Sequence, residues 1–205
     1  MATITPARRQ ATTALLDAAE ELLVEVGHAG VTVRALAERA GVNQGLVHYY
    51  FGSMDELLLQ TLERFTARLI ERQRALYAGP EPFVEKWRTA MRHLTDDLES
   101  GYQKVWLELQ AMAWNHAGMR DRVRQVLYTW VGVLRPAFQD GLAELRIDEE
   151  RLPADVAVAL VATFNQGIIL EQLSGADSGH RLLLDWIDEQ IASAERRAAG
   201  PPRGG

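Results

Sequence analysis

The chain contains no cysteine, and this absence removes several classes of protein at once. Disulfide frameworks, thiolate zinc sites and cysteine nucleophiles all require that residue. Disulfide-bonded proteins belong to oxidising compartments, whereas a chain without cysteine fits a reducing one. We therefore expect a cytoplasmic protein whose fold is held together by its core.

Long apolar runs are also scarce. The N-terminal segment MATITPARRQATT has no apolar run behind its basic pair, and the richest apolar stretch, residues 156–169, is interrupted by Asn165 and Gln166. A transmembrane helix needs about 20 consecutive, predominantly apolar residues. The sequence therefore predicts neither a signal peptide nor a membrane span, and no membrane partner.

Catalytic constellations are missing as well. The sequence has no HExxH motif, no P-loop and no dinucleotide-binding glycine pattern, and its five histidines, at positions 28, 48, 93, 116 and 180, are scattered. An all-helical enzyme would need nucleophile, base or metal ligands grouped at characteristic spacings. We expect a protein that is not an enzyme, with no catalytic residues, no metal site and no cofactor.

Positive charge is in short supply. The formal net charge is −6, and residues 1–51 hold four arginines and no lysine against five acidic residues. Such a balance argues mildly against nucleic acid as a partner, so any DNA binding must use a local surface instead of the overall field. It also predicts a shallow salt dependence, because few phosphates can be neutralised by cationic side chains.

Helical periodicity is what the sequence has in abundance. Ala11, Leu15, Leu22 and Val26 recur at helical spacings, and Gly27 offers a stop. No segment reads as a convincing strand, so we predict an all-α protein of about nine helices. The helices after the first are expected at about 32–40, from Asn43 to about 51, from Ser53 to Leu76, and at 82–99, 102–117, 119–146, 153–174 and 179–198.

The stretch VTVRALAERAGVNQGLVHYYFGSMDELL, residues 31–58, has the pattern of a helix-turn-helix. Thr32 is a candidate N-cap, Ala37 is small enough for a close helix crossing, and Gly41 suits a left-handed turn residue. Ser53, with Glu three residues later, reads as a capping box that opens the next helix. The inner faces are expected to bury Leu36, Ala40, Val42, Val47 and Tyr50.

The outward side chains of this stretch suit a DNA groove. They are short or flat, amides read base edges, and aromatic hydroxyls reach phosphates. A helix N-terminus also carries partial positive charge and holds phosphate with few lysines. A plain helical hairpin with a glycine turn would share part of this pattern. The predicted DNA contacts are Thr32, Arg34, Gln44, Gly45, His48 and Tyr49.

The segment AGVNQGLVHYYFGSMDEL resembles the DNA-binding domain of the TetR family of transcriptional regulators, over about residues 8–60. The resemblance implies a homodimer, a near-palindromic double-stranded DNA operator, and a C-terminal domain that binds an effector and dimerises. We expect a DNA-binding domain at 1–52, a ligand-binding and dimerisation domain at 53–198, and a disordered tail at 199–205. Two departures stand out: Met54 occupies a position that usually holds lysine in the family, and His48 one that often holds tyrosine.

The predicted effector site rests on tryptophans at helical spacing. Trp106, Gln110 and Trp114 share one face of a helix, so an amide lies between two indoles. Apolar walls with a few polar groups are typical of small-molecule pockets, although tryptophans at this spacing more often belong to a core. The effector is expected to be flat and largely apolar. The candidate pocket residues are Trp106, Gln110, Trp114, Trp130, Phe164 and Asn165.

A stripe of small residues indicates a dimer interface. Ala159, Thr163 and Gly167 lie four residues apart on one apolar helix, and small side chains let helices approach closely. With one face of the last helix they would build a four-helix interface between two subunits; packing within one subunit is the alternative. The candidate interface residues are Ala159, Thr163, Gly167, Leu183, Ile187 and Ile191.

Two functions from different classes remain open. The first is a ligand-responsive transcriptional regulator, a repressor that a small effector releases from its operator. The second is a helical ligand-binding or interaction module that has lost operator binding, which Met54 and the acidic balance favour. A mobility shift with DNA separates the two.

Overall fold

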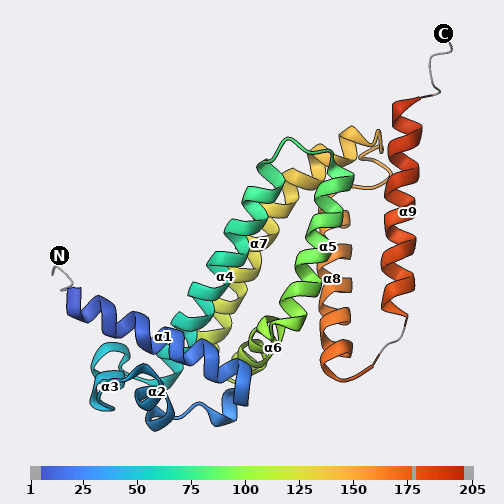
Figure 1. Ribbon diagram of the computed structural model, residues 1–205. Coiled ribbons are helices and arrows are strands. Elements are labelled where there is room, and N and C mark those ends of the chain that lie inside the picture. The colour runs from blue at the N-terminus through green and yellow to red at the C-terminus, as the bar shows by residue number, and fades with distance from the viewer. Residues whose placement is uncertain (1–5, 177–178, 201–205) are drawn as a thin grey trace. The chain divides into compact units, whose positions relative to one another are not determined.

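The computed structural model describes residues 6–176 and 179–200. Every regular element in these ranges is helical, as Figure 1 shows, which confirms the predicted all-α fold. The elements are α1 (Pro6–Val26), the 3₁₀ turn η1 (His28–Gly30), α2 (Val33–Ala40), α3 (Gly45–Phe51), α4 (Met54–Ala78), α5 (Phe83–Glu99), α6 (Tyr102–Ala113), α7 (Ala117–Glu144), α8 (Ala154–Leu173) and α9 (His180–Ala199).

Two predicted boundaries differ from the observed ones. The helix expected at 102–117 ends at Ala113, because the backbone N–H groups of Trp114 and Asn115 turn back to carbonyls three residues earlier and close a tight turn. The predicted tail 199–205 begins too early, since Ala199 is the last residue of α9 and Gly200 is its cap. The rest of that tail, 201–205, lies outside the described residues.

The chain packs into two compact units that cut across the order of the sequence. The first unit comprises residues 1–68 and 97–126, and the second comprises 69–96 and 127–205. The segment expected to bind DNA therefore packs as one body with the first part of α4, with α6 and with the start of α7. The functional boundary between 52 and 53 stays a prediction.

The first unit has a leucine-rich core tied by ion pairs. Leu15, Leu36, Leu62 and Leu109 come from α1, α2, α4 and α6, and all are fully buried. Arginines on α4 bind acidic residues on α1: Arg64 Nη2 lies 2.7 Å from Glu20 Oε1 and Arg68 Nη2 lies 2.6 Å from Glu20 Oε2. Arg122 on α7 binds Glu56 and Glu63 on α4 in the same way.

The second unit has an aromatic core. The rings of Phe83 and Phe138 meet edge to face with centroids 5.3 Å apart, a favourable geometry for aromatic pairs. Gly141 permits this packing, because a Cβ at that position would lie 2.1 Å from Phe83 Cδ2. The carboxylate of Glu144 accepts the backbone N–H of Phe83 and so satisfies the start of α5.

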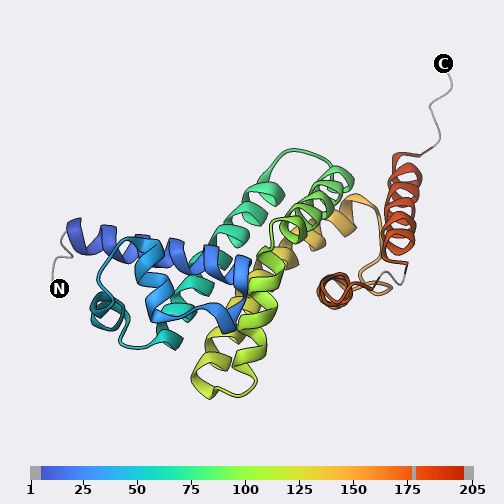
Figure 2. The same cartoon turned by 60° about the horizontal axis from the view of Figure 1, so that its bottom comes forward.

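The face of α8 that carries Leu160 and Leu170 is turned to solvent: both side chains are 58% exposed. Within the described ranges, α8 is also the helix long and apolar enough to cross a membrane by length and composition, a test that core helices of soluble proteins pass as well. Its other face, with Ala157, Val158 and Val161, belongs to the core of the second unit. Figure 2 shows α8 and α9 from a second direction.

Candidate functional site

The helix α2 is capped at both ends as expected. Thr32 Oγ1 accepts the backbone N–H of Ala35 at 3.1 Å, and Gly41 adopts the left-handed conformation at φ 66°. These caps satisfy terminal backbone groups that would otherwise depend on water. Leu36 and Ala37 are buried between the two caps, so the helix presents one fixed face to the core.

The helix α3 begins and ends sharply. Asn43 Oδ1 accepts the N–H of Gly45 at 2.9 Å, and Gly52 at φ 75° ends the helix after seven residues. The inner face is formed by Val47 and Phe51, four residues apart and both buried. Capping by Asn43 was predicted; the burial of Phe51 was not.

The predicted inner face was therefore partly wrong. Leu36 and Val47 are buried as expected, but Ala40, Val42 and Tyr50 are only partly buried. For Tyr50 the reason is the short helix α3, whose single buried stripe runs through positions 47 and 51 and leaves position 50 at its edge. Ala40 is the last residue of α2, and Val42 follows its Gly41 cap. Tyr50 packs its ring against Tyr49, with centroids 5.1 Å apart.

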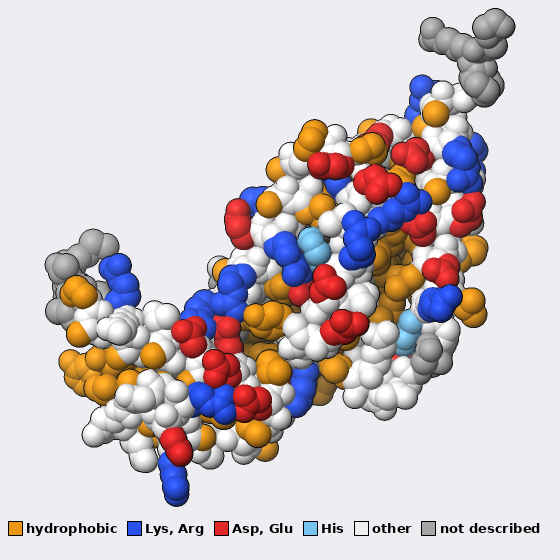
Figure 3. All heavy atoms as spheres, in the orientation of Figure 1, with side chains coloured by type: hydrophobic (Ala, Val, Ile, Leu, Met, Phe, Trp, Pro, Cys, Tyr) orange, Lys and Arg blue, Asp and Glu red, His pale blue; other side chains and the backbone are white. Residues whose placement is uncertain are grey.

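The residues predicted to face DNA do lie on the surface. Gln44, Gly45, His48 and Tyr49 are all exposed, and 72% of Tyr49 is accessible. Figure 3 shows a group of hydrophobic side chains, the class that includes tyrosine, near α3. An amide, a glycine, an imidazole and a phenol thus form one open surface, and their contact with DNA remains a prediction.

The start of α2 adds two groups to this surface. Thr32 and Arg34 are exposed, and Arg34 forms no ion pair with any residue that the structure describes. Its guanidinium is therefore available to a phosphate beside the helix N-terminus. We refer to these six residues, Thr32, Arg34, Gln44, Gly45, His48 and Tyr49, as the recognition surface.

Arg39 has a different task from Arg34. Its guanidinium binds two carboxylates on α1, at 2.9 Å from Glu21 Oε2 and 2.7 Å from Glu25 Oε2. These hydrogen bonds raise the pKa of Arg39, and the bond from Arg39 lowers the pKa of the Glu25 carboxyl. Red and blue side chains lie together over α1 in Figure 3. Arg39 thus holds α2 against α1 and adds little to the field felt by DNA.

The start of α4 forms only one of the two hydrogen bonds of the predicted capping box. Ser53 Oγ accepts the N–H of Glu56 at 3.1 Å. The Glu56 carboxylate does not return to Ser53; it accepts hydrogen bonds from Gln60 and Arg122. Met54, the first residue of α4, is partly buried and leaves this helix start without a cationic side chain.

The six predicted pocket residues fall in both packing units. Trp106 is buried and Gln110 partly buried in the first unit, whereas Trp114 follows the end of α6 and is 67% exposed. The other three belong to the second unit. The Phe164 ring lies 6.1 Å from that of Trp87, and Trp130 packs against the same core. Asn165 Oδ1 is buried without a hydrogen-bond partner among the described residues.

Two residues on α4 were missed by sequence reasoning. Gln73 Oε1 is buried and unpartnered in the described part of the chain, and burial raises the pKa of the Tyr77 hydroxyl to about 12. Tyr77 packs against the aromatic core, 6.4 Å from the Phe138 ring. Their spacing of four residues on the inward face of α4 was the available signal. Both bring polar atoms into an apolar interior, as a ligand site does.

The predicted dimer residues occupy two environments. Ala159, Thr163 and Gly167 are exposed, and a Cβ on Gly167 would meet no atom within 4 Å. On α9, Ile187 and Ile191 pack against the core of their own unit, and Leu183 is 39% exposed. The structure adds Leu182 and Trp186 as the most exposed apolar side chains of α9, at 75% and 61%.

These features define a class of protein. A capped helix-turn-helix with an exposed recognition helix, built on a larger all-helical body, is the architecture of a DNA-binding regulator. Residues 15–61 match the family model described as "Bacterial regulatory proteins, tetR family". An HTH-type transcriptional repressor of Mycobacterium tuberculosis is 30% identical over 174 residues, which cover 75% of this chain and 90% of that protein. The chain belongs to the TetR family and is a transcriptional regulator, not an enzyme.

Other relatives extend over most of the chain. The regulator BetI of Rhizobium meliloti is 29% identical over 162 residues, covering 76% of this chain and 75% of its own. Among solved structures, FadR of Bacillus subtilis in complex with stearoyl-CoA aligns with a TM-score of 0.69 at 20% identity, over 89% of this chain and 98% of that one. A regulator of Saccharomonospora viridis in complex with choline aligns with a TM-score of 0.67 at 18% identity, over 90% and 95%. These structures share the fold.

Proposed function

We propose that this protein is a repressor that binds a near-palindromic operator as a homodimer and is released by a small molecule. The recognition surface carries this proposal. Its six residues, five side chains and the exposed Gly45, lie on or at the start of two short helices that Thr32, Gly41 and Asn43 cap. Fixed backbone with adaptable polar side chains is what direct readout of a major groove requires.

The proposed dimer uses the outward faces of α8 and α9. On α8, exposed leucines flank the small residues Ala159, Thr163 and Gly167, so a partner helix can approach closely. On α9, Leu182, Leu183 and Trp186 supply apolar area. Helices with such faces pack into four-helix interfaces, and two half-sites on DNA demand two recognition helices.

The proposed effector is flat and largely apolar, with one or more polar groups. Aromatic residues supply the walls, and Trp87, Trp130 and Phe164 lie together in the second unit. The buried amide oxygens of Gln73 and Asn165 have no partner in the described residues, and such atoms favour a ligand that donates hydrogen bonds. Two proteins of the same fold were solved in complex with stearoyl-CoA and choline, so an acyl chain and a compact cation are tested beside flat, apolar compounds in a first screen.

Release of the repressor from its operator follows from a second position of α4. This helix begins at the Ser53 cap beside the recognition helix and carries Gln73 and Tyr77 at its far end. An effector that favours a different setting of α4 changes the separation of the two recognition helices. A hundredfold loss of operator affinity requires about 2.7 kcal/mol of differential binding between the two states.

One experiment decides between this function and a helical module that has lost operator binding. The purified protein is bound to a random duplex library, and the retained DNA is sequenced. Enrichment of a palindrome with half-sites about one helical turn apart, or somewhat more, supports the dimeric regulator. A library that stays random after repeated rounds contradicts the proposed regulator and favours a ligand-binding module without operator binding.

A further inference from the structure

The helix α6 reaches the turn that leads into the helix-turn-helix. The carboxylate of Glu108 on α6 accepts the backbone N–H of His28, the first residue of η1. Gly27 provides the room: its φ is +70°, and a Cβ there would lie 2.8 Å from Glu108 Oε1. A side chain 80 residues away in the sequence thus caps the turn between α1 and α2.

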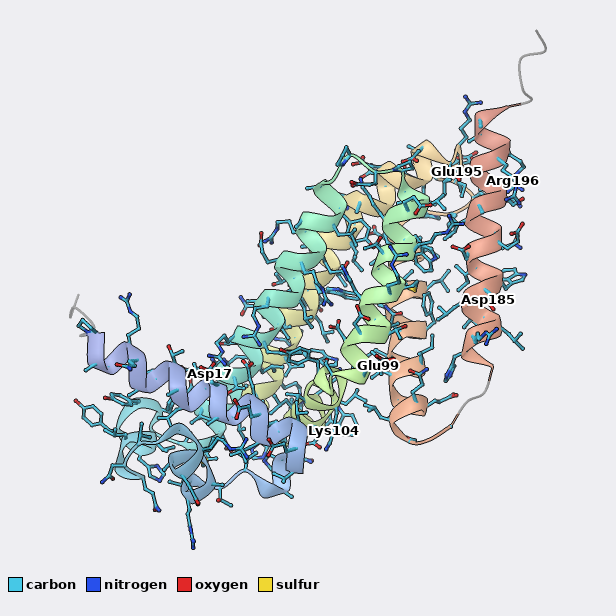
Figure 4. The ribbon with its side chains drawn as sticks, viewed as in Figure 1. Asp17, Glu99, Lys104, Asp185, Glu195 and Arg196 are labelled. Carbon is cyan, nitrogen blue, oxygen red and sulfur yellow. The ribbon has the colours of Figure 1, made fainter. Side chains whose placement is uncertain are left out.

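A second charged residue of α6 holds the end of α1. Lys104, one helical turn before Glu108, donates from Nζ to the backbone carbonyl of Val24 at 3.4 Å. Figure 4 shows Lys104 beside the C-terminal end of α1. Val24 lies in the last turn of α1, where carbonyl groups have no partner within the helix.

The charges of this pair match the backbone they face. The C-terminal end of α1 is the negative end of its dipole and faces an ammonium, whereas the N–H at the start of η1 faces a carboxylate. No side chain next to η1 in sequence caps it, since Gly27 has none to offer. We call Lys104 and Glu108 the α6 latch.

The latch rests on a close and rigid contact. Val105 and Leu109, next to the two charged residues, are almost fully buried. Gly101 starts α6 at φ +78°, where a Cβ would lie 2.8 Å from Val24 Cγ1. The polar ends of the latch are therefore held by apolar packing, and the direction in which the chain leaves α1 for α2 is set from α6.

We propose that Lys104 and Glu108 are positioning residues for operator recognition, although both lie far outside the segment that contacts DNA. This inference rests on the proposed operator binding. The latch fixes the turn at residues 27–31, and this turn sets where the capped start of α2 meets a phosphate. The latch itself reads no base, so its loss lowers affinity for every sequence and leaves base preference unchanged.

The test uses the operator that the wild-type protein selects from the random library. Glu108→Ala is expected to weaken operator binding about tenfold, because the freed turn must be ordered again on DNA, at a cost of up to about one charge-assisted hydrogen bond. Amide hydrogen exchange at His28 is expected to accelerate, while exchange within α2 and α3 stays slow. Glu99→Ala, which removes an exposed carboxylate next to α6, is the matched control and leaves both measurements at wild-type values.

Two further variants separate positioning from a general loss of folding. Glu108→Gln keeps an acceptor oxygen and is expected to restore most of the affinity, and Lys104→Met keeps the apolar stem and is expected to lose several-fold. Equal operator affinity in Glu108→Ala and the wild type overturns the inference, as does a Glu108→Gln variant no better than Glu108→Ala. A wild-type protein that selects no DNA overturns the proposed function instead, before any latch variant is measured.

Discussion

The recognition surface and the outward face of α8 and α9 are both open to solvent, yet their chemistry is opposite. The first offers an amide, an imidazole, a phenol and an arginine that has no ion pair in the described part of the chain, at short capped helices. The second offers leucines, a tryptophan and a stripe of small residues on helices of 20 residues each. Binding at the recognition surface depends on the positions of a few polar atoms, whereas association through α8 and α9 depends on the apolar area buried.

This difference determines which kind of substitution abolishes binding at each surface. Hydrogen bonds to base edges are lost when a helix shifts slightly, so caps and ion pairs such as Arg39 with Glu25 matter on the DNA side. Hydrophobic association tolerates small shifts but not a charge buried without a partner. Substitutions on the two faces should therefore produce different signatures.

The largest effect is expected from a charge on the α8 face. Leu160→Asp would bury an unpaired carboxylate in the dimer, so the dimer should dissociate and operator affinity should fall more than a hundredfold, about 3 kcal/mol. Analytical ultracentrifugation and a mobility shift measure the two effects. Tyr128→Asp, at a residue 69% exposed on α7, is the control that should leave both unchanged. A monomeric Leu160→Asp variant with wild-type operator affinity would contradict the claim that operator binding needs the apolar dimer face.

The next effect belongs to the recognition surface. Gln44→Ala should cost about 1–3 kcal/mol on the preferred operator, roughly five- to 150-fold, and relax base preference at one position of each half-site. The dimer should stay intact. Tyr49→Phe is the companion variant, expected to weaken all sequences alike because it removes only a hydroxyl aimed at phosphate. Selection from a random library by each variant measures preference directly; an unchanged preference in Gln44→Ala would contradict the placement of α3.

Much of the DNA side could be predicted from sequence because its signals are local. Thr32, Gly41 and Asn43 are caps that act within a few residues, and the structure places each where its chemistry predicts. The exposure of His48 and Tyr49 follows from the same short-range geometry. Capping hydrogen bonds need particular residue types next to the helix end, so they can be predicted from the local sequence.

What could not be predicted depends on long-range contacts. Glu108 capping His28 joins residues 80 positions apart, and no spacing rule links them. Ile187 and Ile191 looked like one apolar face of α9, but the core of the second unit takes both and leaves Trp186 outside. The division of the predicted pocket between two packing units has the same origin, since periodicity shows that a face is apolar and not what covers it.

A smaller effect, in the opposite direction, is expected at the start of α4. Met54→Lys places an ammonium at a helix start beside the recognition surface, so operator affinity should rise about threefold to tenfold in about 0.1 M salt. The salt slope should steepen by about one per subunit. Met54→Leu is the neutral control. Fluorescence anisotropy across a salt series measures both quantities, and a gain without a steeper slope would show that the lysine does not meet a phosphate.

The smallest effect concerns the salt dependence of operator binding by the wild-type protein. It tests whether binding depends on the positions of a few polar groups or on the positive charge of the DNA-binding segment. Residues 1–51 supply four arginines per subunit, and Arg39 is already neutralised by Glu21 and Glu25. At most three per subunit remain for phosphates, so the slope of log affinity against log salt should not exceed about 5 in magnitude for a dimer, at about 0.9 per contact. Arg39→Met should lower affinity by loosening α2 while leaving this slope unchanged. A slope near that of a strongly basic repressor, about 10, would mean that cations outside this segment reach the DNA and that electrostatic attraction outweighs placement.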